Sequence, residues 1–342
     1  MRQAYITESG HDAEQGGRSG SRVRAAFGRW RRDPGIWRRG MVLAAFSVLV
    51  GLLMIFHAQI PNRVGNLGSL TETFLPWLGL LVPVLLVLAL LRRSATALIA
   101  LLVPVVVWLN LFGGLVTDKS EDTGEGGLTV ATHNVNADNS DPEGTARQVA
   151  ESGAEVVALE ELTADAVPAY EKALASAYPH HSVVGTVGLW SKYPMSGTGA
   201  VDIRLGWERA MRSTVATPSG DVAVYVAHLP SVRVKMNSGF TASQRDESAD
   251  ALGAAIARDE VPRVVLLGDL NGTMNDRSLN AVTAQMRSTQ GAAGDGFGFS
   301  WPASFPMARI DQIMVKGVEP VSSWTLPRTA SDHLPIAARV TF

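Results

Sequence analysis

Three long apolar runs dominate the first third of the chain. They cover residues 41–60, 74–91 and 95–116, and none of them contains Asp, Glu, Lys or Arg. A helix needs about 20 such residues to cross the hydrocarbon core of a bilayer. Soluble domains rarely contain three uncharged runs of this length in succession. The pattern therefore predicts three transmembrane helices.

The rest of the chain has a different pattern, in which short apolar runs alternate with amphipathic segments. Many strands and few helices predict an α+β fold, with helices covering two sheets. We expect strands at residues 128–133, 156–159, 182–187, 211–217, 222–228, 263–267, 310–315 and 336–341, and helices at residues 144–152, 165–177, 243–259 and 277–284.

These patterns divide the chain into four parts. Residues 1–40 are rich in Arg, Gly and Ser, which predicts a disordered basic tail. The three-helix transmembrane region follows at residues 41–117. Residues 118–127 are acidic and glycine-rich, as in a short linker. Residues 128–342 are numerous enough to form one catalytic domain with a sizeable core.

Basic residues decide the expected orientation of the helices. Eight arginines lie between residues 18 and 39, and Arg92 and Arg93 lie in the turn between the second and third runs. The loop between the first and second runs carries only Arg63. Lys and Arg are retained on the cytoplasmic side of a membrane. We therefore expect a multi-pass protein of the cell (plasma) membrane, with a cytoplasmic N-terminus and an extracytoplasmic catalytic domain.

Charge and cysteine content narrow the function further. Residues 1–117 contain 12 basic and 5 acidic side chains, whereas residues 118–342 contain 18 basic and 27 acidic ones. An acidic domain is a poor partner for a nucleic-acid backbone, so nucleic acid is disfavoured as a partner. The chain has no cysteine, which excludes thiol catalysis and a disulfide framework.

Polar side chains stand where the predicted strands end. Any one of them is usually a turn former or a structural residue. Together they place oxygen and imidazole chemistry at the ends of rigid elements, where sites are commonly built. The residues are Asn134, Glu160, Glu161, His228, Asp269 and Asn271 after strands, and Asp311, Asp332 and His333 at or before the start of others.

This series resembles the endonuclease/exonuclease/phosphatase superfamily, and its motifs occur in the family's order over residues 128–342. The resemblance implies a four-layered α/β sandwich of the DNase I-like type. It also implies hydrolysis of phosphate esters with Mg²⁺, or with Mn²⁺ as the alternative. The motifs are Thr132-His133-Asn134-Val135, Ala158-Leu159-Glu160-Glu161, Ala227-His228-Leu229, Gly268-Asp269-Leu270-Asn271, Arg309-Ile310-Asp311 and Ser331-Asp332-His333-Leu334-Pro335-Ile336.

The resemblance implies a role for each of these residues. Glu161 would be the principal Mg²⁺ ligand, with Asn134 and Asp332 close to the metal. His333, oriented by Asp311, would lie against the scissile phosphorus. Few carboxylates, with water and substrate phosphate completing the shell, are what Mg²⁺ prefers in proteins.

Three further roles concern the attacking water and the phosphate oxygens. Asp269 and Asn271 would position the water and a phosphate oxygen, and His228 would donate to another phosphate oxygen. Whether Asp269 or His333 activates the water stays open from the sequence. Four departures from the family pattern leave a nuclease without specific support: His133, Asn136, Ala227 and Gln312.

Topology and motifs together predict a membrane-anchored phosphohydrolase with a lipid phosphate as substrate. Three spans before such a domain resemble actinobacterial membrane proteins linked to glycopeptide (teicoplanin-type) resistance. That resemblance implies hydrolysis of undecaprenyl pyrophosphate at the outer leaflet, in recycling of the cell-wall carrier. The alternatives are an extracellular nuclease or phospholipase C-like phosphodiesterase, and a catalytically inactive membrane-tethered binding protein.

Overall fold

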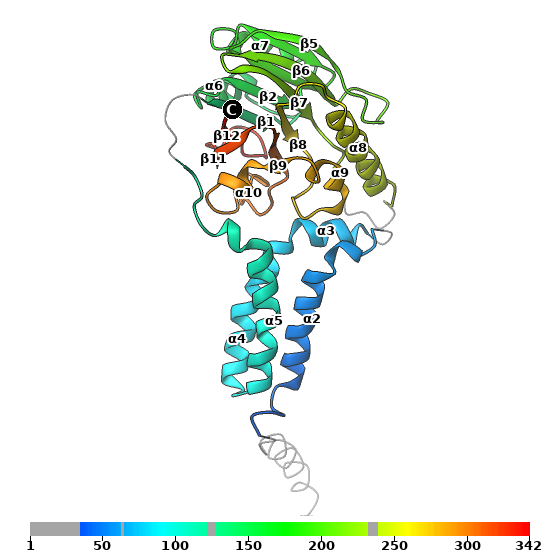
Figure 1. The fold of residues 1–342 in the computed structure, drawn as a ribbon, viewed down its shortest axis with the longest axis vertical. Coiled ribbons are helices and arrows are strands. Elements are labelled where there is room, and N and C mark those ends of the chain that lie inside the picture. Colours follow the sequence, from blue (N-terminus) through cyan, green and yellow to red (C-terminus); the bar gives the residue numbers. More distant parts are fainter. Residues whose placement is uncertain (1–34, 63–64, 122–126, 232–238) are drawn as a thin grey trace, which may run out of the picture.

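The computed structural model describes residues 35–62, 65–121, 127–231 and 239–342. A bundle of apolar helices carries a larger domain built from two β-sheets, and Figure 1 shows the bundle as a stalk beneath the sheets. Most of the predicted disordered tail, residues 1–40, and part of the predicted linker, residues 118–127, lie outside the described residues.

Two six-stranded sheets form the larger domain, with strand orders β11-β12-β1-β2-β4-β3 and β5-β6-β7-β8-β10-β9. Each sheet has one parallel pair at its centre, β1 with β2 and β7 with β8, and all its other neighbours are antiparallel. The strands are β1 (Leu128–Asn134), β2 (Val156–Glu160), β3 (His180–Val184), β4 (Val187–Ser191), β5 (Met195–Ala200), β6 (Ala210–Thr217), β7 (Gly220–Ala227), β8 (Val264–Asp269), β9 (Arg287–Ser288), β10 (Asp311–Lys316), β11 (Glu319–Thr325) and β12 (Ile336–Thr341).

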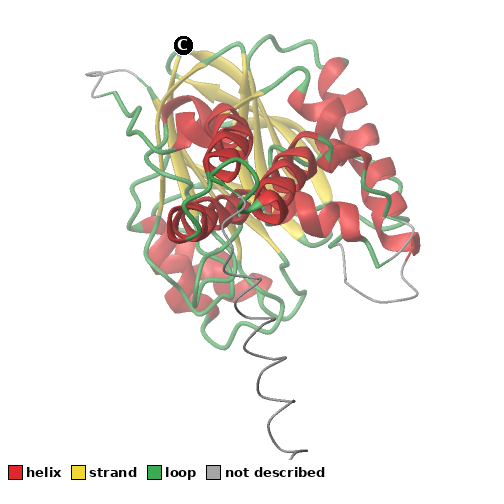
Figure 2. Cartoon of the chain, turned by 90° about the horizontal axis from the view of Figure 1, so that it is seen from below, coloured by secondary structure: helices red, strands yellow, loops and turns green. Residues whose placement is uncertain are grey.

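The two sheets pack face to face, and helices cover their outer faces. Apolar side chains of both sheets, such as Val130 and Leu267, form the central core. Helices α6 (Pro142–Ala150) and α7 (Val167–Leu174) pack on the first sheet. Helices α8 (Gly239–Ala257) and α9 (Asn280–Thr283) pack on the second. Figure 2 shows helices on both sides of the strands. The predicted α+β architecture, two sheets flanked by helices, is confirmed.

The pattern of apolar and polar residues located most of the strands, but it missed a hairpin turn and a polar strand at the edge of a sheet. The run 182–187, predicted as one strand, contains the end of β3 and the start of β4. The turn between them uses Gly185 at φ 59°, where an added Cβ would lie 2.1 Å from the Glu208 carbonyl oxygen. Strand β5 has the sequence MSGTGA, which lacks the apolar positions that predict a strand.

Only one of the three predicted transmembrane helices is long and apolar enough by itself to cross a bilayer. It spans Ala95–Leu115, 21 residues, and consists of α5 (Ala95–Phe112) with the 3₁₀ turn η3 (Gly113–Leu115). A second candidate exists only if Leu67–Thr73 and Leu75–Leu91 count together across a 68° bend. The prediction of three full-length spans is therefore wrong for the described part of the chain.

Two of the apolar runs are longer than the α-helices they contain. Helix α2 (Met41–Ile55) has 15 residues, and the chain then enters the 3₁₀ turn η1 (His57–Gln59). The second run begins with the 3₁₀ segment η2 (Leu75–Leu80), so only α4 (Leu81–Leu91) is α-helical. Pro76 near the start of η2 has no N–H to donate to a helix. Apolar length alone overestimated helical length.

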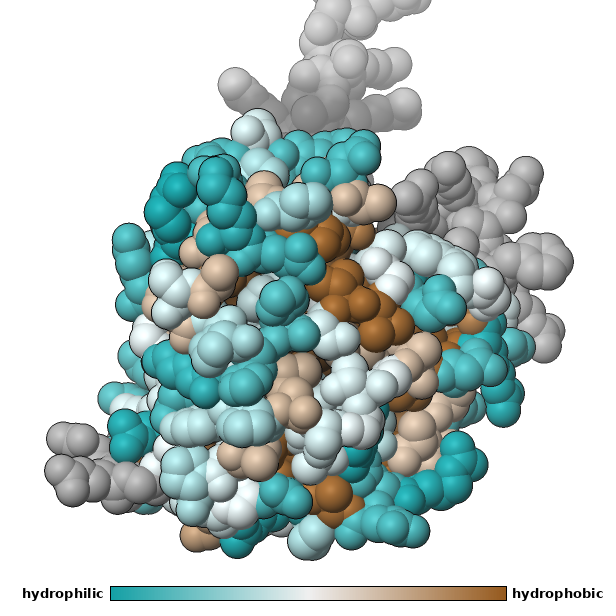
Figure 3. All heavy atoms as spheres, turned by 90° about the horizontal axis from the view of Figure 1, so that it is seen from above, coloured by the Kyte–Doolittle hydropathy of each residue, from teal (hydrophilic) through white to brown (hydrophobic). Residues whose placement is uncertain are grey.

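The helical unit, residues 36–116, exposes large apolar side chains. Among the described residues, all exposed large hydrophobic side chains except Trp207, Phe305 and Phe342 lie within this unit. Val42, for example, is 84% exposed. Figure 3 shows the opposite end of the molecule, where hydrophilic residues cover most of the surface. Helices that are apolar on all sides are normally found in a protein core or in a membrane.

Candidate active site

The predicted polar side chains meet at one end of the sandwich. Strands β1 and β2 end at Asn134 and Glu160, which are register partners. In the other sheet, β8 ends with Asp269 opposite Asp311, the first residue of β10. His228 follows β7, the parallel neighbour of β8. Because parallel strands end at the same edge of a sheet, residues far apart in sequence become neighbours here.

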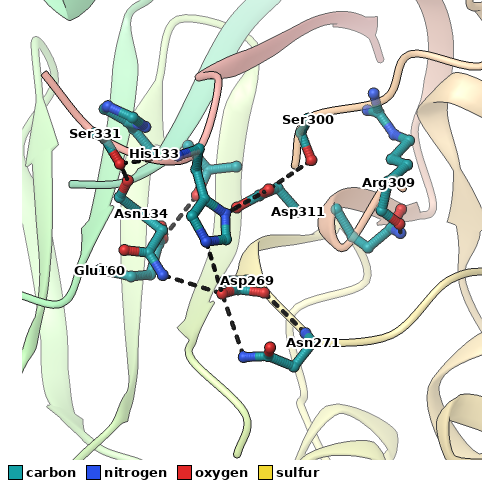
Figure 4. Close-up of polar contacts among 12 residues, drawn as sticks. His133, Asn134, Glu160, Asp269, Asn271, Ser300, Arg309, Asp311 and Ser331 are labelled. Atoms are coloured by element: carbon teal, nitrogen blue, oxygen red, sulfur yellow. Dashed lines mark hydrogen bonds and ion pairs between the residues drawn. The ribbon is translucent and has the colours of Figure 1, made fainter. Parts of the chain in front are cut away.

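Asn134 connects two carboxylates from different sheets. Its Nδ2 donates to Glu161 Oε1 (3.1 Å) and to Asp269 Oδ2 (3.0 Å), the latter drawn in Figure 4. Glu161 has a left-handed backbone (φ 62°), and its Oε2 accepts from the Ala137 N–H (3.1 Å). Such a conformation is uncommon outside glycine and often marks a functional position. The predicted pair Asn134 and Glu161 is thus in direct contact.

The loop after β8 holds its polar groups through tight backbone geometry. Gly268 has φ 143°, and an added Cβ would lie 2.0 Å from the Ala227 carbonyl oxygen, so only glycine fits beside β7. Asn271 has φ 48°. Its backbone N–H donates to Asp269 Oδ1 (2.8 Å), and its Nδ2 donates to Asp269 Oδ2 (3.2 Å) and to the Leu229 carbonyl (2.9 Å). Asp269 and Asn271 therefore act as one rigid unit.

Asp269 lies in an environment that supports proton transfer. Its side chain is buried, and every hydrogen bond to it comes from a donor on Asn134 or Asn271. Burial and the neighbouring Asp311 carboxylate raise the pKa of Asp269 to about 7. A carboxylate with a pKa near neutrality can accept a proton from water more effectively than an ordinary surface carboxylate can.

His333 forms a buried ion pair with Asp311. Its Nδ1 donates to Asp311 Oδ2 (2.9 Å), and the Ser300 hydroxyl donates to the same oxygen (2.5 Å). Burial alone would lower the pKa of His333, but Asp311, with a smaller contribution from Asp269, raises it to about 10. His333 is therefore an imidazolium at neutral pH, and its Nε2–H points toward Asp269 Oδ2, 3.9 Å away.

His228 is held in the opposite protonation state. Its Nδ1 accepts from the Arg209 guanidinium, which leaves Nε2 as the donor, 3.6 Å from Glu161 Oε1 and 3.7 Å from Asp269 Oδ2. Burial, then the charges of Arg209 and His333, lower the pKa of His228 well below its ordinary value. The site thus contains one neutral and one charged imidazole, and each presents an N–H.

The two adjacent glutamates have different roles. Glu160 is fully buried and accepts from the Thr132 hydroxyl (2.7 Å), and burial raises its pKa well above the ordinary value. His133 is also fully buried, with Nε2 on the Thr329 hydroxyl (2.8 Å), and burial lowers its pKa to about 3. Both are neutral structural residues behind the site, which leaves Glu161 as the carboxylate that faces the pocket.

A pocket of about 470 Å³ lies in front of these groups. A volume of this size is typical of a site for a small organic ligand or group. Of the eight predicted site residues, six line it, and Asn134 and Asp311 hydrogen-bond to members of that lining. The lining residues among the predicted eight are Glu161, His228, Asp269, Asn271, Asp332 and His333.

Comparison with known proteins identifies the family of the chain. The sequence model of the endonuclease/exonuclease/phosphatase family matches residues 131–333, more than half of the chain. The chain belongs to the endonuclease/exonuclease/phosphatase family. It is accordingly a phosphoric ester hydrolase. No curated protein matches the sequence.

Several solved structures have the same fold as this chain, although their sequence identity to it is low. TDP2 from D. rerio, complexed with a single-strand DNA product, is 18% identical, with a TM-score of 0.53 over 64% of this chain and 100% of that one. Mannosyl-6-phosphatase from Bacteroides thetaiotaomicron is 18% identical, with a TM-score of 0.51 over 63% and 100%. A family protein from Beutenbergia cavernae is 18% identical, with a TM-score of 0.51 over 64% and 72%.

Enzymes of this family depend on a divalent metal, and the site contains suitable ligands. One buried cluster, Asp269, Asp311 and His333, has potential ligand atoms within 4.8 Å of one another. In that cluster, however, His333 Nδ1 is committed to Asp311. An imidazolium has no lone pair for a metal. These three side chains therefore form a chain of ion pairs rather than a set of metal ligands.

Glu161 fits a metal ion better than that cluster does. Its side chain is 32% exposed toward the pocket, and Asn134 is hydrogen-bonded to it. Asp332, an exposed residue, lines the same pocket. Oxygen ligands with room for water are what Mg²⁺ requires. The predicted set Glu161, Asn134 and Asp332 would hold such an ion, which would neutralise charge on the phosphate.

Sequence reasoning missed the side chains that orient the site residues. Arg209 fixes the His228 tautomer, and Ser300 bonds Asp311. Both lie in irregular segments without a pattern that points to the site. Ser331 lies in the motif that contains His333, and its hydroxyl donates to the Asn134 carbonyl (2.7 Å). That bond fixes the His333 loop to β1.

The ion pair predicts a shift in the pH profile of Asp311→Asn. Without the counter-charge, the pKa of His333 falls from about 10 to its ordinary value or below. The protonated fraction at pH 8 then drops roughly 30-fold, and kcat/KM for a phosphate ester drops with it. Losing Asp311 also lowers the pKa of Asp269, so the whole pH profile moves toward acid. A profile lowered equally at every pH would contradict this account.

Proposed function

We propose that this protein is a membrane-anchored, Mg²⁺-dependent phosphohydrolase that acts on a lipid phosphate at the outer leaflet. The observation that carries the proposal is the position of the pocket, which lies between the catalytic groups and the helical unit. A lipid phosphate has its charged group at the membrane surface and its chain in the bilayer. Among lipid phosphates we propose undecaprenyl pyrophosphate, in carrier recycling linked to teicoplanin resistance, because three apolar runs precede the catalytic domain in the sequence, as in the proteins it resembles.

Basic residues support a membrane insertion with the catalytic domain outside. The Arg38–Arg39 segment and the Arg92–Arg93 turn lie side by side, since the Ser94 hydroxyl donates to the Arg39 carbonyl and the Ala95 N–H donates to the Ile36 carbonyl (3.0 Å). This end of the bundle is the one far from the catalytic domain (Figure 1). Positive residues stay in the cytoplasm, so the catalytic end would be outside.

The lengths of the helices define how the bundle would sit in the membrane. Helix α2 has 15 residues, about 22 Å at 1.5 Å per residue, and a hydrocarbon core is about 30 Å thick. Such a mismatch costs a fraction of a kcal/mol per Å and thins the bilayer locally. The three-helix bundle would therefore enter the membrane as one unit and bring the pocket close to the head groups.

The proposed reaction is in-line attack of water on the terminal phosphorus, which breaks the bond to the bridging oxygen and releases inorganic phosphate and the lipid monophosphate. Asp269, with its pKa near 7, accepts the proton from water. His333 already carries its proton, so it donates to a phosphate oxygen instead. The neutral His228 donates a second hydrogen bond through Nε2. The question left open by the sequence, whether Asp269 or His333 activates the water, is answered in favour of Asp269 in this proposal.

A phosphodiesterase acting on nucleic acid or phospholipid is the second candidate. It is favoured by the likeness to TDP2 bound to a single-strand DNA product. The acidic composition of residues 118–342 opposes it, because nucleic acid requires a basic face. An inactive binding protein is disfavoured, since all eight predicted site residues are present and gathered at one place.

The test is phosphate release from undecaprenyl pyrophosphate by the purified full-length protein in detergent micelles. We expect release with Mg²⁺, and loss of release with EDTA and its return when Mg²⁺ is added back. Plasmid DNA and sphingomyelin are assayed in parallel. Cleavage of either one without release from the lipid pyrophosphate would exclude the proposed substrate and favour the second candidate.

A further inference from the structure

Helix α3 (Leu67–Thr73) lies at the junction between the helical unit and the catalytic domain. Figure 1 shows it crossing the top of the stalk, directly beneath the strands and helices that carry the site. The sequence suggested only an outer loop between the first two apolar runs at this place. The structure gives the segment a defined position against the active site.

A fully buried arginine fixes α3 relative to the catalytic loop. Arg245 is 1% exposed and donates to the Ser69 hydroxyl of α3 (3.1 Å) and to the Asn271 carbonyl (2.6 Å). Its charge is balanced by buried Asp276 at 2.7 Å. Losing one partner of a buried pair is costly, so this connection is rigid. The Thr273 hydroxyl adds a bond to the Glu72 carbonyl (3.2 Å).

The residues before α3 are attached in the same way. Asn62 accepts from the Ser69 N–H (2.8 Å) and donates to the Ser69 hydroxyl (3.0 Å). The Arg277 guanidinium donates to the Ile60 carbonyl (2.7 Å) and to the Ala58 carbonyl. Arg277 and Thr273 of the catalytic domain thus hold backbone of the helical unit before α3 and in its last turn.

One face of α3 lines the active-site pocket. Leu70, Thr73 and Phe74 line it together with Asn66 and Ser69, opposite the phosphate-handling groups. We call these five residues the α3 wall. It contains no charged side chain, and Leu70 is 36% exposed. Leu67, the other leucine of α3, is 47% exposed but does not line the pocket.

We infer that the α3 wall binds an apolar chain bonded directly to the phosphate or diphosphate of the substrate. This inference rests on the proposed function and deepens it. The cationic and N–H groups on one side of the pocket hold phosphate oxygens. A chain leaving the phosphate on the other side meets Leu70 and Phe74. The hydroxyl groups of a sugar there would lose water without gaining a hydrogen bond from these two side chains.

The same wall restricts what can reach the site. A nucleic-acid duplex needs an open groove along the sheet ends, and α3 stands across that approach. The helical unit is therefore a part of the active site and determines its specificity, in addition to anchoring it. The substrate class is an alkyl or isoprenyl phosphate without a bulky polar group between the phosphate and the chain.

The absence of cysteine from the chain allows a direct test. Leu70→Cys and the matched control Leu67→Cys each place a single thiol on α3 in the full-length protein. The rate of thiol labelling by methyl methanethiosulfonate is measured in the presence of dodecylphosphonate, whose C–P bond is not hydrolysed. The comparison ligand is methylphosphonate, which has no chain. At ten times its Kd, dodecylphosphonate should slow labelling of Leu70→Cys about tenfold. It should leave Leu67→Cys unchanged, and methylphosphonate at the same concentration should protect neither.

Labelled Leu70→Cys should also lose kcat/KM for a lipid diphosphate, whereas labelled Leu67→Cys should keep it. Thr73→Cys, on the same wall, replaces Leu70→Cys if that variant does not fold. If the wild type hydrolyses the lipid diphosphate but neither wall thiol is protected, the inference fails and the proposed function stands. Equal protection by methylphosphonate would also overturn it. A wild type that hydrolyses no lipid phosphate refutes the proposed function itself.

Discussion

Replacing His333 by alanine is expected to lower kcat/KM for the lipid pyrophosphate about 10³-fold, within the range for a positioned acid or base. His333 is the one imidazole of the site that carries a charge, since Asp311 raises its pKa to about 10. Its N–H faces the pocket beside Asp269. Alanine removes both the positive charge and the donor that stabilise negative oxygen in the transition state. Phosphate release under saturating Mg²⁺ measures the loss.

A matched control separates this role from a general effect of losing a histidine. His181 lies at the edge strand β3, where it pairs with Glu171 (3.3 Å) in an exposed position. His181→Ala should therefore retain the wild-type rate. Thermal unfolding of His333→Ala should remain cooperative but occur at a lower temperature, because Asp311 loses its partner in a buried ion pair. A loss below tenfold in a folded His333→Ala protein would remove His333 from the reaction.

The sequence located the side chains that gather at the pocket better than it located the ends of the apolar helices. Asn134, Glu161, Asp269 and His333 follow or precede apolar strands, and strand ends are fixed by register once the sheets form. Pairing of the strands thus brings residues that are far apart in the sequence together at one end of the sheets. Arg209 escaped prediction because its place beside His228 depends on a loop, and no periodicity describes a loop.

In the helical unit, the sequence pattern did not predict the lengths of the helices. Apolar composition measures how much of a segment avoids water, but helical length depends on backbone hydrogen bonds. The bonds of α2 end with the one that the Phe56 N–H donates to the Leu52 carbonyl, and Pro76 has no N–H to donate. Helix α3 was missed for a related reason. Its sequence LGSLTET has two leucines among polar residues, too few for an apolar pattern, and its position is set by contacts to Arg245.

The Asp269→Asn substitution is expected to lower kcat by about 10³-fold, as when a general base is removed. Asparagine keeps the size of the side chain but cannot accept a proton. In the wild type, only the ionised carboxylate can act, so activity should rise as the pH increases through the Asp269 pKa, which is about 7 before a metal binds. A bound cation would move this limb toward lower pH. The residual activity of Asp269→Asn should lack the limb altogether.

The pH dependence distinguishes a base from a structural residue. Asp269 Oδ2 accepts from both Asn134 Nδ2 and Asn271 Nδ2. An amide NH₂ group at this position would face these two donors, so the substitution also disturbs packing. A packing defect lowers activity equally at every pH, whereas removal of a base also abolishes the acid limb. Asp221→Asn, at the exposed start of β7, is the control that should change neither rate nor profile. An Asp269→Asn profile that kept the wild-type limb would assign water activation to another group.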